Sequence, residues 1–249
     1  MKALTLAFQD DPRFAELKKH RDESGGIHHV WGMDRRITPL LMEALSDTKR
    51  FRLIVTYEER RAREIVEDYR FYSRQTFYYP AKDALFYSAD IHSNNTVQER
   101  LEIFKKIAEG RPCTVVTTIE GLMDKIPSIS HIIENILTIK VGDTLQLDTF
   151  SRKLTTLGYE KTSIVETPGQ FSVRGGIIDI FSLTEECPYR VELWGDDIDS
   201  IRSFDVESQR SMERVEEFVI YPSTEMVLDD VRISKGIAKL EKEHKAQAK

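Results

Sequence analysis

Compact apolar runs alternate with helical patterns in the first half of the chain, and this alternation limits the fold more than any other feature. Three runs have the length and the β-branched content of buried strands, namely 51–57 (FRLIVTY), 75–79 and 112–118 (PCTVVTT). Helical patterns surround them at 12–24, 38–45, 58–72 and 96–110. Strands separated by helices pair in parallel through right-handed crossovers. We therefore predict an α/β domain with a parallel sheet over residues 24–134.

Local signals predict where several of these elements begin and end. Asp11 and Pro12 are placed to begin the first helix, and Gly25-Gly26 is placed to end it. The segment 28–31 has the pattern of a short strand. Residues 96–99 (TVQE) match a capping box, which predicts that the third long helix starts there.

After residue 135 the pattern changes to short strands separated by turns. The predicted strands are 135–141, 171–173, 177–181, 189–194, 198–204 and 215–221, with one helix at 147–157. Turn residues lie at Gly175-Gly176, at 185–188 and at Gly195-Asp196. This pattern predicts an α+β module with an antiparallel sheet over residues 135–221. A helical tail follows from 229 to 249, with an apolar stripe formed by Ile233, Ile237 and Leu240.

The segment Gly32–Pro39 (GMDRRITP) stands where an α/β nucleotide-binding protein has its phosphate loop, GxxxxGK[ST]. Ile37 replaces the second glycine, Thr38 the lysine, and Pro39 the hydroxyl residue that would hold Mg²⁺. The loop therefore lacks the groups that bind phosphates, and we expect no cofactor and no ATP hydrolysis. The simpler interpretation is an ordinary strand-to-helix turn with exposed arginines.

The most informative stretch is the pair of predicted strands FSVRGG and YRVELW. In the second strand Val191 and Leu193 point one way, so Arg190, Glu192 and Trp194 share the other face. If the strands are neighbours, Arg174 lies at the same surface and Glu192 is placed to orient one guanidinium. An exposed Trp beside an Arg is typical of protein-interaction hot spots. The alternative is a solvated sheet face with a cross-strand ion pair and a Trp194 that a loop covers.

Composition and spacing exclude several classes of function. The formal net charge is −6, which disfavours nucleic-acid binding driven by net charge. No apolar run approaches the roughly 18–20 residues that span a bilayer. Cys113 and Cys187 have no metal-ligand spacing, so we expect no metal, a cytoplasmic location and two cysteines that fill the core.

Other chemistry-bearing clusters have a structural interpretation. His28 and His29 lack ligand partners nearby in the sequence, and the carboxylates at 196–199 follow a turn glycine. The aromatic cluster 77–87 contains little Lys or Arg for nucleic-acid binding, so packing explains it better. We identify no catalytic residues.

Three long phrases carry a family resemblance: PGQFSVRGGIIDIF, YRVELWGDDIDSIRSFDVESQRS and YPAKDALFYSADIHSNN…QER. They resemble the N-terminal region of bacterial transcription-repair coupling factor (Mfd), which is similar to the excision-repair protein UvrB. The resemblance implies a degenerate P-loop-like domain 1A at 24–134 and a domain 2 at 135–221. It also implies a small helical or mixed remnant, domain 1B, from 1–23 and 222–249. The stretch 79–100 is too short for the DNA-gripping hairpin of UvrB.

The resemblance also implies a partner, because domain 2 in this family docks the damage sensor UvrA. The positions that match the family's contacts are Arg174, Arg190, Glu192, Leu193 and Trp194. Trp194 stands where relatives usually have Phe. The expected function is a non-catalytic module that binds UvrA and recruits nucleotide excision repair to stalled RNA polymerase.

The resemblance places other contacts outside this chain, and two other functions stay open. In the full-length family protein, RNA polymerase, DNA and an intramolecular C-terminal domain are further partners, and the whole protein is an ATP-dependent DNA translocase. One alternative is a nucleotide- and DNA-binding enzyme fragment of UvrB type. A second is a DNA-binding remnant that uses Arg60, Arg61, Arg63 and the tyrosines.

Overall fold

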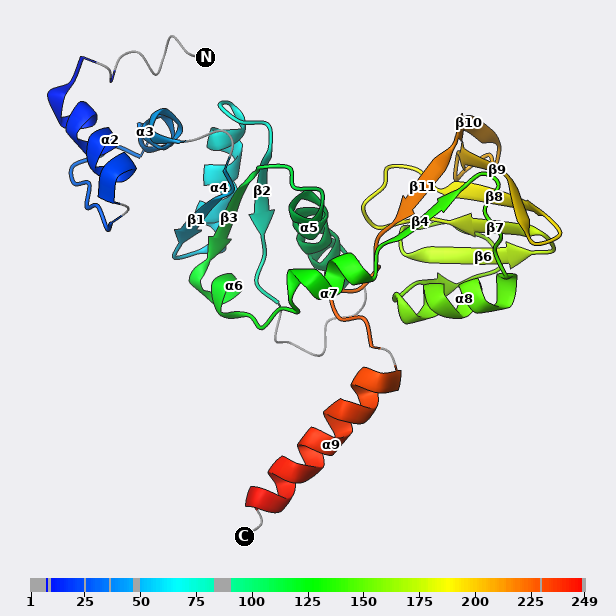
Figure 1. Ribbon diagram of the computed structural model, residues 1–249. Coiled ribbons are helices and arrows are strands. Elements are labelled where there is room, and N and C mark those ends of the chain that lie inside the picture. Colours follow the sequence, from blue (N-terminus) through cyan, green and yellow to red (C-terminus); the bar gives the residue numbers. More distant parts are fainter. Residues whose placement is uncertain are drawn as a thin grey trace. The chain divides into compact units, whose positions relative to one another are not determined.

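The computed structural model describes residues 8, 10–24, 26–35, 37–46, 50–82, 91–228 and 230–247 (Figure 1). The chain divides into two compact units. Unit 1 consists of residues 1–86 and 110–124, and unit 2 of residues 87–109 and 125–249. Parallel and antiparallel sheets both occur, so the predicted mixed α/β character is confirmed.

Unit 1 contains a parallel sheet in the order β1-β3-β2. Its elements are α2 (Pro12–Ser24), α3 (Thr38–Leu45), β1 (Arg52–Thr56), α4 (Glu59–Arg70), β2 (Thr76–Tyr79), β3 (Thr114–Thr118) and α6 (Ile119–Met123). Helix α4 packs Ala62 and Val66 against Val116 and Tyr78 of the sheet. The predicted alternation and parallel pairing are therefore confirmed. The backbone N–H of Arg13 donates to the Asp11 carboxylate at 2.9 Å, which supports the predicted start of α2.

Two predictions for unit 1 are wrong. Residues 28–31 form no strand, and the neighbouring side chains of Ile27 and Trp31 are 89% and 87% exposed. The reason is that an apolar run becomes a strand only beside a partner strand, and residues 28–31 have none. Strand β1 is not fully buried either, because Leu53 on the face away from α4 is 57% exposed.

Unit 2 is built around a six-stranded sheet in the order β10-β9-β8-β7-β6-β5 (Figure 1). Its strands are β5 (Glu160–Lys161), β6 (Gln170–Arg174), β7 (Ile177–Ile180), β8 (Tyr189–Trp194), β9 (Asp197–Phe204) and β10 (Ser211–Val215). All pairs are antiparallel except β5 with β6. A two-stranded antiparallel sheet joins β4 (Leu137–Lys140) to β11 (Glu217–Ile220). The predicted antiparallel module is therefore confirmed.

The helices of unit 2 are α5 (Ile91–Ala108), α7 (Ile129–Glu134), α8 (Leu147–Thr156) and α9 (Asp230–Gln247). Leu154 and Leu157, at the end of α8, pack against the larger sheet in the main core. Helix α9 is confirmed, but Ile233, Ile237 and Leu240 of its predicted stripe are exposed. None of the described helices combines the length and the apolarity needed to cross a bilayer.

Boundary predictions in unit 2 need two corrections. Helix α5 begins at Ile91, so the predicted capping box 96–99 lies inside the helix. The predicted strand 215–221 is divided between two strands. Val215 is the last residue of β10, which pairs with β9, whereas β11 begins at Glu217 and pairs with β4. The predicted domain boundaries at 24–134, 135–221, 1–23 and 222–249 stay predictions.

A buried ion pair ties α5 to the segment that follows β11. Arg100 is fully buried and its Nε donates to Oε1 of Glu225, while Nη2 donates to Oε2 at 3.3 Å. The hydroxyl of Tyr221 donates to Glu109 at 3.2 Å. These contacts join residues more than one hundred positions apart, so they fix α5 within unit 2.

Candidate functional site

The larger sheet of unit 2 has two chemically different faces. The inner face buries Phe171, Ile178, Val191 and Ile201 in the core that α8 also contacts. Alternate residues of β6 to β10 point to the opposite side, which we call the outer face. The predicted inward direction of Val191 is confirmed, and Leu193 packs against the same core.

Strand register arranges the outer face in two rows. One row runs Ser172, Asp179, Arg190 and Arg202 across β6, β7, β8 and β9. The next row runs Arg174, Ile177, Glu192 and Ser200. Strand β7 therefore lies between the two predicted site strands, and the two arginines share one face without being direct neighbours.

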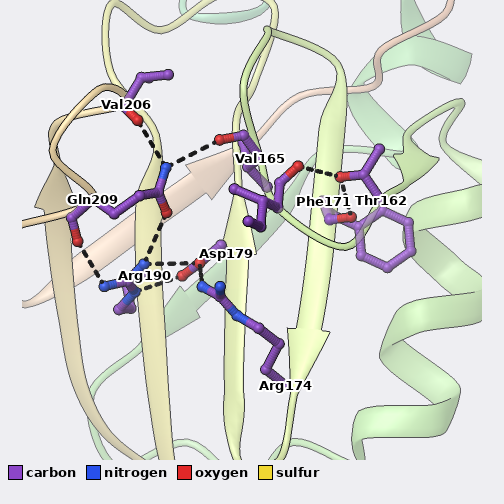
Figure 2. A network of polar contacts seen from close by, with 9 residues as sticks. Thr162, Val165, Phe171, Arg174, Asp179, Arg190, Val206 and Gln209 are labelled. Carbon is purple, nitrogen blue, oxygen red and sulfur yellow. Dashed lines mark hydrogen bonds and ion pairs between the residues drawn. The ribbon is translucent and has the colours of Figure 1, made fainter.

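Asp179 is the residue that joins the two arginines (Figure 2). Its side chain is fully buried, and Oδ2 accepts a hydrogen bond from Nη2 of Arg174 at 2.5 Å. Arg190 donates from Nε to Oδ1 at 2.7 Å and from Nη2 to Oδ2 at 2.9 Å. One carboxylate thus carries a two-pronged contact with Arg190 and a single contact with Arg174, which makes both bonds charge-assisted.

Arg190 is also held from its other side. Its Nη1 donates to the backbone oxygen of Gln209 at 3.1 Å, and its guanidinium carbon lies 4.6 Å from the centroid of the Phe204 ring. The Gln209 side chain donates to the backbone oxygens of Val165 and Val206, so a small loop framework surrounds the arginine (Figure 2). The hydrogen bonds with Asp179 raise the pKa of the Arg190 guanidinium above its usual value. The Arg190 side chain is only 15% exposed.

Arg174 and Trp194 are the exposed members of the predicted set. The Arg174 side chain is 44% exposed, and within the described residues Asp179 is its one recorded partner. Trp194 is 85% exposed at the end of β8, so the expected covering loop is wrong. The cross-strand ion pair of that same alternative is present, between Arg190 and Asp179. The surface therefore presents guanidinium donors and an indole ring to solvent.

Glu192 has a different partner from the one expected. Its carboxylate accepts a hydrogen bond from the Ser200 hydroxyl at 2.7 Å, and Asp179 orients the arginines instead. Asp179 is not among the residues predicted from the sequence. The signal was present in the strand IIDIF, because a charged residue between Ile178 and Ile180 must face away from the core.

The double-glycine turn holds the site strands together. The backbone N–H of Leu193 donates to the oxygen of Gly176 at 2.8 Å. A β-carbon on Gly176 would lie 3.0 Å from the backbone oxygen of Leu193, and Gly175 has a φ of 59°. Glycine is therefore required for the β6–β7 turn to approach β8, where Trp194 is located.

The other candidates show structural roles. Thr38 donates its hydroxyl to the backbone oxygen of Asp34 at 3.0 Å, and Ile37 is exposed. The carboxylate of Asp197 accepts from the Thr144 hydroxyl at 2.9 Å. Cys113 is buried as expected, whereas Cys187 is partly exposed and burial raises the pKa of its thiol. Among the described residues, no group of potential metal ligands comes together.

Comparison with known proteins shows what this chain is similar to. The sequence family described as UvrB interaction domain matches residues 137–226, which include the whole outer face. A transcription-repair-coupling factor of Staphylococcus aureus (strain USA300) is 30% identical over 236 residues, or 94% of this chain. The corresponding protein of Bacillus subtilis (strain 168) is 28% identical over 198 residues, or 79% of this chain.

Over most of its length the chain is similar to the transcription-repair-coupling factors. The resemblance expected from the sequence is thereby confirmed. The chain spans only 20% of the length of the Staphylococcus aureus coupling factor and 17% of that of Bacillus subtilis. The segment that matches the UvrB interaction domain contains Asp179 together with all five predicted site residues.

Proposed function

We propose that the outer face of β6 to β8 docks the excision-repair damage sensor UvrA. The chain then recruits nucleotide excision repair to stalled RNA polymerase and has no catalytic activity of its own. The relationship to the coupling factors and the match to a UvrB interaction domain support a role in transcription-repair coupling. The observation that carries the proposal of UvrA docking is the buried Asp179 carboxylate, which fixes two arginines on the face that exposes Trp194.

The predicted site residues have separate roles in this proposal. Arg174 and Trp194 contact the partner, because among the five predicted site residues they are the exposed cation and the exposed ring. Arg190 is a positioning residue that holds Asp179, since its guanidinium is already engaged on both sides. Glu192 lies at the border of the contact, and Leu193 anchors the strand in the core.

The arrangement lowers the cost of docking. A free arginine loses rotamer freedom when a partner binds it, and each ordered long side chain costs about 0.5–1.5 kcal/mol. Asp179 already restrains Arg174 in the unbound chain. Trp and Arg are the residue types most enriched among interface hot spots, so a small surface of this composition is sufficient for specific binding.

Titration of purified UvrA with single variants tests the proposal. We expect Arg174→Ala and Trp194→Ala each to weaken binding at least tenfold, by removing a hot-spot contact worth roughly 2 kcal/mol. Arg152→Ala is the matched control, because Arg152 is exposed on α8, which packs on the inner side of the sheet. Wild-type affinity in both test variants, with circular dichroism showing folded protein, would contradict the proposal.

A nucleotide-binding enzyme of UvrB type is the alternative, and residues 32–39 give it no support. Thr38 occupies the lysine position and its hydroxyl bonds within the turn. We expect millimolar ATP with Mg²⁺ to leave the thermal midpoint unchanged, whereas binding to the folded state would raise it.

We also propose that residues 24–134 form a degenerate P-loop-like domain with residues 135–221 inserted after it, and that 1–23 and 222–249 form a remnant domain. The three-stranded parallel sheet supports the first part. Limited proteolysis with mass spectrometry should then give first cleavages near residues 24, 135 and 222. We propose that this chain does not itself contact RNA polymerase or DNA, because the resemblance assigns those contacts to other parts of the full-length family protein.

A further inference from the structure

Three arginines lie directly opposite one another on the outer face. Arg190 of β8 is in register with Arg202 of β9, and Arg202 is in register with Arg214 of β10. We call this set the arginine row. Directly opposite residues of antiparallel strands have β-carbons about 4.5–5.5 Å apart, and like charges in that arrangement destabilise the sheet. An arrangement of this kind needs a compensating anion.

Among the residues that the structure describes, a carboxylate pairs with only one end of the arginine row. Arg190 is paired with the buried carboxylate of Asp179. Arg202 is partly exposed, and in the described part of the chain its side chain makes no hydrogen bond or ion pair. Arg214 is exposed, and its single recorded contact is a 3.4 Å hydrogen bond to the backbone oxygen of Asp199. Two neighbouring guanidinium groups therefore lack a carboxylate partner in a chain whose net charge is −6.

We propose that Arg202 and Arg214 bind a carboxylate-bearing segment of the docking partner. This inference rests on the proposed function, since the partner is UvrA. Asp179 provides the structural precedent, because it bridges two arginines on the same face with one carboxylate. A partner carboxylate placed between Arg202 and Arg214 repeats that arrangement and relieves the repulsion between them. The docking surface then extends from β6 across the sheet to β10.

An acidic protein segment fits the arginine row better than a nucleic acid does. Arg190 makes the row continuous with the face that carries Arg174. The carboxylate of Glu192 lies on the same face, and the net charge of −6 disfavours a phosphate backbone. A single carboxylate, by contrast, fits the two forked donors of neighbouring arginines.

The test compares Arg202→Gln, Arg214→Gln and the double variant in titrations with UvrA at low and high salt. Arg152→Gln is the control with the same change of charge on α8. We expect each single variant to bind roughly three- to tenfold more weakly and the double variant at least tenfold more weakly, with a smaller salt dependence. We expect the thermal midpoint of Arg202→Gln to stay the same or rise, since a repulsion is removed. A residue that only stabilised the fold would give the opposite shift.

The outcomes separate this inference from the proposed function. If wild type does not bind UvrA, both are overturned. If Arg174→Ala weakens binding but the double glutamine variant binds like wild type, only the inference is overturned. The inference also fails if Arg202→Gln lowers the thermal midpoint as much as it lowers the affinity. The inference is also overturned if wild type binds a DNA duplex in a salt-dependent way and the double variant loses that binding while it still binds UvrA. The arginine row would then be a nucleic-acid site.

Discussion

At the residue scale, the proposed docking surface depends on Asp179 more than on either arginine. A fully buried carboxylate is stable only when its charge is balanced and its oxygens are bonded. Arg190 supplies two hydrogen bonds and Arg174 one, so the three side chains form a single unit. A change at Asp179 therefore alters both the stability of unit 2 and the geometry of the exposed arginine.

We predict that Asp179→Ala lowers the free energy of unfolding by about 3 kcal/mol, because it leaves two guanidinium groups without their buried partner. Urea denaturation followed by circular dichroism measures this. The control is Asp196→Asn at an exposed turn position, which should change stability by less than about 0.5 kcal/mol. Equal stabilities of Asp179→Ala and wild type would show that the buried ion pair is not formed in solution.

Replacing each arginine with lysine should distinguish the positioning residue Arg190 from the contact residue Arg174. Arg190→Lys loses the two-pronged bond to Asp179 and the stacking on Phe204, so we expect a loss of about 1–3 kcal/mol of stability. Arg174→Lys keeps one charge beside Asp179 and should lose less than about 1 kcal/mol. The reverse order of the two effects in urea denaturation would contradict the assigned roles.

At the element scale, the two-residue turn between β6 and β7 positions the end of β8. Its approach leaves no room for a side chain at Gly176. Gly176→Ala should lower stability by about 1–3 kcal/mol, because the turn must move away from Leu193. Gly26→Ala is the control, since a β-carbon there meets nothing within 4 Å. A thermal midpoint of Gly176→Ala equal to that of wild type would show that the turn yields without cost.

The strands of unit 2 were predictable because their alternation is strong and local. Phe171, Ile178 and Val191 lie on the inner face as the pattern indicates. Strands β5 and β10 were missed, because the first has two residues and the second is mostly exposed. The wrong strand at 28–31 has the opposite cause: its composition fits, but strand formation requires a partner that lies elsewhere in the chain.

The candidate site was predictable in part for the same reason. Alternation places Arg190 and Trp194 on one face, and the exposure of Trp194 agrees with that. The bridging role of Asp179 depends on which strands are neighbours and in which register, and no single strand contains that information. The partner of Glu192 was mispredicted because Ser200 comes from a different strand, β9.

At the scale of the whole molecule, the residues that carry the proposed docking surface all lie in unit 2. The buried pair Arg100–Glu225 joins helix α5 to the segment after β11, far from the outer face in sequence. We predict that Glu225→Gln lowers the stability of unit 2 by roughly 3–5 kcal/mol, because a buried ion pair loses one charge.

The same variant should leave UvrA affinity within about twofold of wild type at a temperature where it is folded, since distant sites without shared partners act independently. Hydrogen exchange and a UvrA titration on one sample measure both quantities. A tenfold loss of affinity in folded Glu225→Gln would show that the ion pair and the docking surface are coupled.

The outer face of the larger sheet is proposed to bind UvrA. The most direct measurement is a calorimetric titration of purified UvrA with the wild-type chain and with the Arg174→Ala, Trp194→Ala double variant. We expect micromolar or tighter binding by wild type, and loss of that binding in a double variant whose circular dichroism is unchanged. No binding by the folded wild-type chain, or equal binding by both proteins, would contradict it.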